Sequence, residues 1–227
     1  MHNTSLAMLQ ISGLFGGLDK QALTAVLGAA QAKRHARGSR LVTQDVRADS
    51  VHFLLSGALK LTATDGETAI TLGFIRPGAS IGEQSVLARM PYVFTAKTIA
   101  QSETLVWPAA RFEGLTGDFP QIATNCIALA IARERQMLRR MRAGNENVEK
   151  RIARAVTELA ATETGWQESG IVIPASGRDI AQLSNTTVYT VSRVLSRWKR
   201  RELLAGGRGN FQILDAPRLR QIIDGMD

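Results

Sequence analysis

The chain of 227 residues is 44% hydrophobic, which is sufficient for two apolar cores, and its net charge of +8 favours an acidic partner. Its single cysteine, Cys126, excludes an intramolecular disulfide and a metal cluster bound by four cysteines of one chain. Because we find no secretory signal pattern and no apolar run of the roughly 18 residues that a spanning helix needs, we expect a cytoplasmic protein without a membrane segment.

The first part of the chain predicts a short helix followed by an antiparallel barrel. Apolar residues at helical spacing indicate an amphipathic helix from about Asp19 to Ala32. From Arg40 to Trp107, short β-rich runs alternate with turn signals such as Asp65-Gly66 and Arg76-Pro77-Gly78. Their spacing of roughly ten residues is typical of a β-barrel or jelly roll.

A long helix is expected to start at Asp118 and Pro120 and to run for about 24 residues. Its apolar stripe is wider than one small barrel can cover, so we expect two such helices to pack together in a homodimer. The alternative is a helix that packs only on its own barrel. We expect Cys126 to be a small buried apolar residue of this helix. The interface residues that we predict are Ile127, Ile131, Leu138 and Met141.

The predicted long helix carries a basic strip toward its end, since residues 133–144 hold five basic side chains and one acidic one. Gly144-Asn145 then breaks the helix. A further helix is expected from Val148 to Thr162. We therefore predict a barrel domain over residues 1–117, a dimerisation helix with a hinge over 118–144, and a third region over 145–227.

A winged helix-turn-helix is predicted from residue 176 to residue 214. Ser176 and Asp179 form a capping box that opens a short helix, and Ser184-Asn185-Thr186-Thr187 supplies the turn. A second helix is expected from Val188 to Arg201. Its helical spacing directs one set of residues to the core, namely Val191, Val194, Leu195 and Trp198. The opposite stripe, Tyr189, Ser192, Arg193, Ser196 and Arg200, is polar and basic, as the face of a helix that reads DNA should be.

A wing follows the second helix. The glycine-rich run of residues 206–210 separates Leu203-Leu204 from Phe211-Gln212-Ile213-Leu214, and this pattern predicts a hairpin with Arg208 at its tip. From Arg193 to Arg208 the chain has six basic residues and one acid, Glu202. Such an excess of cations favours contact with DNA phosphates over an ordinary solvated face.

The order of these elements resembles the family of bacterial regulators that contains the cyclic-AMP receptor protein and FNR. The likeness covers nearly the whole chain and is carried by residues 52–61, 76–83 and the winged helix. It implies an α+β protein with an effector barrel resembling the cyclic nucleotide-binding domain, a central dimerisation helix and a carboxyl-terminal winged helix-turn-helix. It further implies a homodimer that binds double-stranded DNA, with RNA polymerase as a partner.

Departures from the family pattern indicate that cyclic AMP is not the effector. Phe94 stands where cyclic-AMP-binding members have an arginine that pairs with the phosphate, and Gln136-Met137 replaces the pair that contacts adenine. The effector pocket is expected to include Gly82, Glu83, Phe94 and Thr95, with a small molecule of unknown identity. The cysteines that hold the iron-sulfur cluster of FNR are absent.

The second helix of the winged motif most resembles the nitrogen-oxide-responsive NnrR-type branch of the family, through residues 185–193. That branch implies sensing of nitric oxide by haem, for which His35 or His52 could serve as an axial ligand. No other cofactor and no metal site is expected. A cupin-like barrel enzyme is the rival class, but His2, His35 and His52 lack the spacing of its metal ligands.

We therefore expect a transcription regulator and not an enzyme. Val188, Tyr189, Ser192 and Arg193 are the predicted base-reading residues. The predicted phosphate contacts are Thr187, Arg197, Lys199, Arg200 and Arg208.

Overall fold

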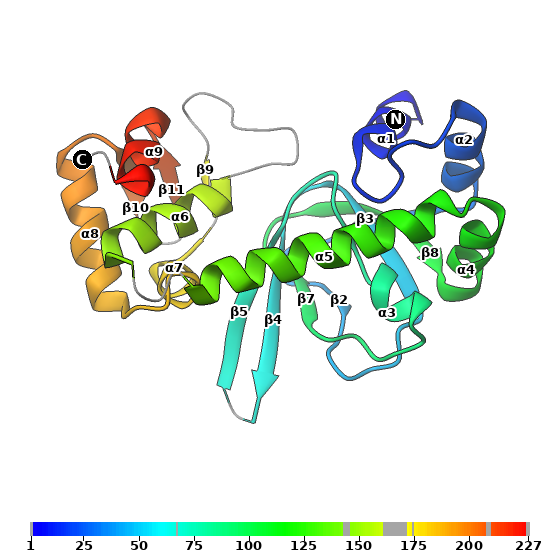
Figure 1. Ribbon diagram of the computed structural model, residues 1–227, viewed down its shortest axis with the longest axis horizontal. Helices are drawn as coiled ribbons and strands as arrows, with labels where there is room; N and C mark the ends of the chain where they lie inside the picture. The colour runs from blue at the N-terminus through cyan, green and yellow to red at the C-terminus, as the bar shows by residue number, and fades with distance from the viewer. Residues whose placement is uncertain are drawn as a thin grey trace. The chain divides into compact units, whose positions relative to one another are not determined.

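The computed structural model describes residues 2–66, 68–142, 146–160, 172–173, 175–207 and 210–225. These residues fall into two compact units, Met1–Gln136 and Met137–Asp227 (Figure 1). The predicted fold class is confirmed, because the chain has an antiparallel β-sandwich, a long helix and a winged helix-turn-helix in that order. The predicted hinge at Gly144-Asn145 lies outside the described residues.

Two helices precede the strands. α1 spans His2–Ile11 and α2 spans Lys20–Gly28, and the Asp19 side chain caps α2 by accepting a 2.8 Å hydrogen bond from the Ala22 N–H. The helix predicted from about Asp19 to Ala32 therefore begins where expected but ends earlier, at Gly28. The chain leaves the helix after Gly28 because residues from Gln31 onward pair with a strand, and this pairing outweighs local helix propensity.

The strands of the first unit form two four-stranded antiparallel sheets. In hydrogen-bonded order, the first sheet contains β1 (Gln31–His35), β8 (Ser102–Pro108), β3 (Ser50–Ser56) and β6 (Ser80–Ile81). The second contains β2 (Arg40–Val42), β7 (Thr95–Thr98), β4 (Leu59–Asp65) and β5 (Thr68–Ile75). β4 and β5 form a hairpin that extends beyond the other strands of its sheet (Figure 1).

Aromatic residues from distant parts of the chain join the amino-terminal helices to the first sheet. Phe15 lies 5.3 Å from Trp107 and 6.1 Å from Phe53, measured between ring centroids. The buried Trp107 indole donates a 2.8 Å hydrogen bond to the Val26 carbonyl of α2. All three rings are buried, so this cluster anchors the core of the first unit.

Three helices complete this part of the chain: α3 (Glu83–Leu87), α4 (Ala109–Asp118) and α5 (Gln121–Arg142). α5 has 22 residues, close to the predicted length. Its buried face holds Ile122 and Cys126, which pack into the core of the first unit. α4 was not predicted from the sequence, because its apolar positions Phe112 and Leu115 are few and glycines interrupt it.

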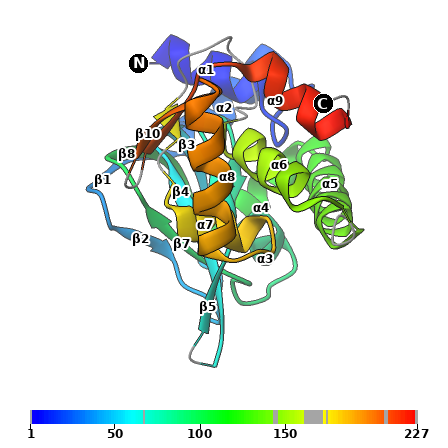
Figure 2. The same ribbon diagram turned by 90° about the vertical axis from the view of Figure 1, so that its left-hand side faces the viewer.

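The second unit contains the winged helix-turn-helix. Its elements are α6 (Val148–Ala160), β9 (Val172–Ile173), α7 (Gly177–Leu183), α8 (Val188–Arg200), β10 (Leu204–Gly207), β11 (Asn210–Ile213) and α9 (Ala216–Asp224). α7 lies at the amino-terminal end of α8, and the β10–β11 hairpin lies at the other end (Figure 2). β9 pairs with β11 and gives the wing a third strand that the sequence did not predict.

None of the helices in the described part of the chain is long and apolar enough to cross a membrane.

Candidate nucleic-acid interface

The first helix of the motif, α7, begins with the predicted capping box. The Ser176 hydroxyl accepts a 3.2 Å hydrogen bond from the Asp179 N–H, and the Asp179 carboxylate accepts one of 2.9 Å from the Ser176 N–H. These reciprocal bonds satisfy two backbone donors at the start of the helix. The capping box is thus confirmed, and it fixes where α7 begins.

The turn between α7 and α8 is fixed by Arg151 of α6. Its guanidinium donates to the Ser184 carbonyl at 2.9 Å and to the Asn185 carbonyl at 3.3 Å. Asn185 has a φ of 48°, in the left-handed region that asparagine tolerates better than most residues. Arg151 therefore sets the path by which the chain enters α8, a role that sequence reasoning missed because 34 residues separate Arg151 from Asn185.

α8 is amphipathic as predicted. Thr187 caps it by accepting a 3.1 Å hydrogen bond from the Thr190 N–H. The four predicted core residues are all buried, namely Val191, Val194, Leu195 and Trp198. The opposite side is solvent-exposed, since Tyr189 retains 71% of its surface and Val188 retains 48%. Both side chains are therefore accessible from solvent on this side of α8.

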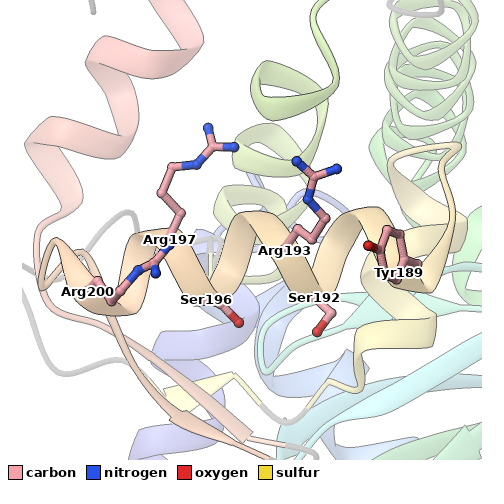
Figure 3. Close-up of a pocket in the computed structure, with 6 residues that line it drawn as sticks. All are labelled: Tyr189, Ser192, Arg193, Ser196, Arg197 and Arg200. Carbon is pink, nitrogen blue, oxygen red and sulfur yellow. The ribbon is translucent and has the colours of Figure 1, made fainter.

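Polar and basic side chains line a shallow groove along the exposed side of α8. They are Tyr189, Ser192, Arg193, Ser196, Arg197 and Arg200. Figure 3 shows Arg193 and Arg197 extending to one side of the helix axis, whereas Ser192 and Ser196 point to the other. The Arg193 guanidinium lies 6.0 Å from the centroid of the Tyr189 ring, within range of a cation–π contact.

Arg197 differs from the other basic residues of α8. Its guanidinium donates a 2.7 Å hydrogen bond to Glu149 of α6, as one half of an ion pair. The Trp198 indole donates a 2.7 Å bond to the other carboxylate oxygen of Glu149. Arg197 was predicted as a phosphate contact, but this pairing commits part of its guanidinium to holding α8 against α6.

Lys199 and the wing are also in contact. The Lys199 ammonium lies 5.7 Å from the centroid of the Phe211 ring in β11. β10 and β11 pair through Gly207 and Asn210, which confirms the predicted hairpin. Arg208, the predicted tip, lies outside the described residues.

The predicted effector residues Gly82 and Glu83 lie at the start of α3. Gly82 has a φ of 91°, and a Cβ there would stand 2.7 Å from the Ser50 carbonyl oxygen, so the position requires glycine. Glu83 is fully buried, and its Oε1 accepts a 2.7 Å hydrogen bond from Arg133 of α5. Arg133 also donates to the Ser80 carbonyl at 2.9 Å. The Oε2 of Glu83 has no hydrogen-bond partner among the described residues.

The other two predicted effector residues do not join this site as a group. Phe94 is half-buried and packs against the core of the first unit. Thr95 lines a separate hollow on the second sheet, whose lining residues do not include Gly82, Glu83 or Phe94. Adjacent residues of a strand point to opposite faces, and the residue next to Thr95, Ala96, is the buried one. Of the four predicted effector residues, Thr95 is the one that lines this hollow.

Each of the two candidate haem ligands has one ring nitrogen, Nε2, within hydrogen-bond distance of a hydroxyl group. The Nε2 of His52 lies 3.2 Å from the Ser50 hydroxyl, and burial lowers the pKa of His52 to about 4. The Nε2 of His35 lies 2.9 Å from the Thr104 hydroxyl. Neither histidine is among the residues that line the groove on α8 or the hollow that contains Thr95. Across the described ranges, no group of three or more histidine, cysteine or acidic residues could hold a metal ion.

α5 presents an apolar stripe on the side away from its buried face. Ile127, Ile131 and Leu138 are 63%, 43% and 45% exposed. The side chain of Met141, the fourth predicted interface residue, lies outside the described part of the chain. Three of the four predicted interface side chains are therefore exposed on this helix.

Comparison with known proteins identifies both halves of the chain. Residues 32–118 match the cyclic nucleotide-binding domain family, and residues 150–222 match the Crp-like helix-turn-helix domain family. The transcriptional regulator SdrP of Thermus thermophilus is 27% identical over 179 residues, covering 78% of this chain and 85% of the relative. The cyclic AMP receptor protein of the same organism is 26% identical over 217 residues, covering 95% and 98%.

A solved structure, that of the Thermus thermophilus catabolite activator protein, superimposes with a TM-score of 0.54 at 25% identity. The match covers 95% of this chain and 100% of the other. The likeness thus extends through both units and is not limited to one domain.

Proposed function

The chain belongs to the CRP/FNR family of transcription regulators, with a helix-turn-helix DNA-binding domain, and we propose that it acts as a homodimer that reads a two-fold-symmetric DNA site through α8. The observation that carries this proposal is the division of α8 into two faces. One face is buried through Val191, Val194 and Trp198, whereas the other is exposed, polar and basic. The exposed face of such a helix can enter a major groove while the buried face stays packed in the core.

The proposed base readers are Val188, Tyr189, Ser192 and Arg193. Arg193 presents the fork of donors that pairs with O6 and N7 of guanine. Its contact with the Tyr189 ring holds the guanidinium near one orientation before DNA binds, which reduces the entropy lost on binding. The Val188 side chain, which is 48% exposed, can meet a thymine methyl group.

The proposed phosphate contacts are Thr187, Lys199, Arg200 and Arg208. Arg197 is assigned a mixed role, because its ion pair with Glu149 leaves only part of its guanidinium for DNA. The helix amino terminus at Thr187 adds exposed backbone donors, which favour a phosphate in the same place.

Homodimerisation is proposed to occur through the exposed stripe of Ile127, Ile131, Leu138 and Met141 on α5. The two recognition helices would then lie about one turn of DNA apart, roughly 34 Å. In this arrangement residues 118–144 form the dimerisation segment between the effector domain and the DNA-binding domain. RNA polymerase is the expected partner at promoters.

The effector is proposed to be a small molecule other than cyclic AMP. One relative is named for cyclic AMP, but this chain has Phe94 and Gln136-Met137 at the two places where we expect phosphate and adenine contacts. The likeness of α8 to the NnrR-type branch favours a signal from nitrogen-oxide metabolism. The hydrogen-bonded state of His35 and His52 does not favour haem as the sensor of that signal.

The deciding experiment is the selection of duplexes from a random pool by the purified full-length protein. We expect an enriched palindrome whose half-sites lie one helical turn apart. The Arg193→Ala variant should enrich a degenerate version of that palindrome. Selection of no motif, or of the same motif by the variant, would contradict the proposal.

A further inference from the structure

One of the arginines that line the groove on α8 is paired with a carboxylate. Arg197 donates a 2.7 Å hydrogen bond through its Nη1 to the Oε2 of Glu149, which lies in the first turn of α6. Arg193 precedes Arg197 by four residues, and both guanidinium groups extend to the same side of α8 (Figure 3). A duplex that contacts Arg193 therefore comes within reach of the long Arg197 side chain.

Glu149 is held more firmly than Arg197. Its second carboxylate oxygen, Oε1, accepts a 2.7 Å hydrogen bond from the indole of the buried Trp198, and its N–H donates a 2.9 Å bond to the Asn147 side chain. A negative charge is also favoured in the first turn of a helix. The Glu149 side chain is 20% exposed, whereas that of Arg197 is 41% exposed. When the pair separates, the guanidinium is therefore the group that moves.

Glu149 and a DNA phosphate offer the Arg197 guanidinium the same chemistry. Both are anions whose oxygens accept hydrogen bonds from the fork of donors on an arginine. An ion pair as exposed as this one adds little to stability, so its exchange for a phosphate is nearly balanced in free energy. Glu149 has the advantage of position, because a partner in the same chain is present at a high effective concentration. A phosphate therefore displaces the carboxylate only where the DNA is held in place.

We propose that Glu149 competes with DNA phosphates for Arg197 and thereby restrains binding to non-cognate DNA. This inference rests on the proposed reading of DNA by α8. On the cognate site, base contacts hold α8 in the groove, and a phosphate beside Arg197 replaces the carboxylate. On other sequences α8 is not held in this way, and Arg197 stays with Glu149. Phosphate contacts carry no sequence information themselves, so withholding one from non-cognate DNA raises the ratio of cognate to non-cognate affinity.

The test is Glu149→Gln in the full-length protein, measured by anisotropy titrations on the selected duplex and on a scrambled one at several salt concentrations. The glutamine keeps an oxygen for the Trp198 indole, but its amide N–H groups face the donors of Arg197 and release them. We expect at least threefold tighter binding to the scrambled duplex, a salt slope steeper by about one unit, and a smaller gain on the selected duplex. Unchanged binding to the scrambled duplex, or an equal gain on both duplexes, would overturn the proposal.

Glu202→Gln is the matched control for net charge. Glu202 is an exposed acid just beyond the end of α8, so this change removes the same charge from the same unit and leaves the pair of Glu149 and Arg197 in place. The control variant should bind both duplexes within twofold of the wild type. A gain on the scrambled duplex as large as that of Glu149→Gln would assign the effect to net charge and contradict the proposal.

Arg197→Ala separates competition from a structural effect of Glu149. In this background Glu149→Gln should not change the affinity for the scrambled duplex, because no guanidinium is released. Arg197→Ala alone should lower the salt slope on the scrambled duplex by less than Arg200→Ala does, because Glu149 already withholds Arg197. Equal decreases in these two alanine variants would refute the competition even if Glu149→Gln fails to fold. Binding to scrambled DNA requires no selected motif, so failure here is distinguishable from failure of the proposed function.

Discussion

The Trp198 indole donates a 2.7 Å hydrogen bond to the Oε1 of Glu149, and this bond fastens the recognition helix α8 to α6. Because Trp198 is fully buried, removal of the acceptor would leave its N–H without a partner. An unsatisfied buried donor costs about 1–3 kcal/mol. Glu149 therefore acts as a positioning residue for α8, although it is not on the DNA-binding face.

Glu149→Ala should lower the free energy of unfolding by about 1–3 kcal/mol and weaken binding to the selected DNA site. Glu149→Gln keeps an acceptor for Trp198 but loses the ion pair with Arg197, so it should lose less stability than the alanine variant. Urea unfolding followed by fluorescence, together with DNA binding, measures both effects. If the two variants lose equal stability, the bond to Trp198 does not anchor α8.

Arg193→Ala should weaken binding to the selected site by about 1–3 kcal/mol and relax the base preference at one base pair. The guanidinium is exposed and held beside Tyr189, so its removal leaves the fold of α8 intact. Arg200→Ala is the comparison, because a phosphate contact should weaken binding to all sequences and lower the salt slope by about one unit. Anisotropy titrations on the selected and a scrambled duplex at several salt concentrations separate the two roles. If Arg193→Ala loses equal affinity for both duplexes, Arg193 is not a base reader.

The arrangement of α7 and α8 could be predicted from the sequence because local signals decide it. The capping box of Ser176 and Asp179 uses residues three apart, and the buried face of α8 follows from its 3.6-residue period. The same holds for the wing, whose glycine-rich turn separates two apolar runs. The formation of α7, α8 and the wing therefore depends mainly on local sequence and little on contacts with distant parts of the chain.

Contacts between distant segments could not be predicted. Glu149 and Arg151 of α6 hold α8 and its preceding turn, yet each looks like an ordinary surface charge in a helical pattern. The position of Thr95 in the lining of the hollow likewise depends on which face of β7 is buried. β7 has only four residues, of mixed polarity, and these are too few to predict from the sequence which face of the strand is buried. Pairing between strands also ended the predicted helix of residues 19–32 earlier than its periodicity suggested.

Ile131→Asp should convert the proposed homodimer to a monomer. Ile131 lies in the exposed apolar stripe of α5, where an aspartate would be desolvated at the proposed interface. Ala132→Asp is a matched control, because Ala132 is exposed on the same helix but points about 100° away from its neighbour. Sedimentation should show a monomer for the first variant and a dimer for the second. A dimeric Ile131→Asp that still binds the palindrome would place the interface elsewhere.

Acid should destabilise the first unit through His52. Burial lowers the pKa of His52 to about 4 in the folded chain, below the ordinary histidine value of 6.5, so the folded state binds fewer protons than the unfolded state between these values. The stabilisation is complete above pH 6.5 and falls as the pH drops to 4, by roughly 3 kcal/mol in total. Urea unfolding of the wild type and of His52→Gln across this pH range measures the loss of stability. If both proteins lose equal stability as the pH falls, His52 does not contribute.

Cyclic AMP should not switch this protein. Phe94 packs against the core and offers no charge to a cyclic phosphate, and Arg133 already donates to Glu83 and to the Ser80 carbonyl. A phosphate buried without a partner costs several kcal/mol, which is enough to abolish useful affinity. Calorimetry with cyclic AMP should detect no micromolar binding, and the affinity for the selected DNA should change less than twofold. Micromolar binding that tightens the DNA complex tenfold or more would refute this, because it would require a charge partner for the phosphate within the barrel.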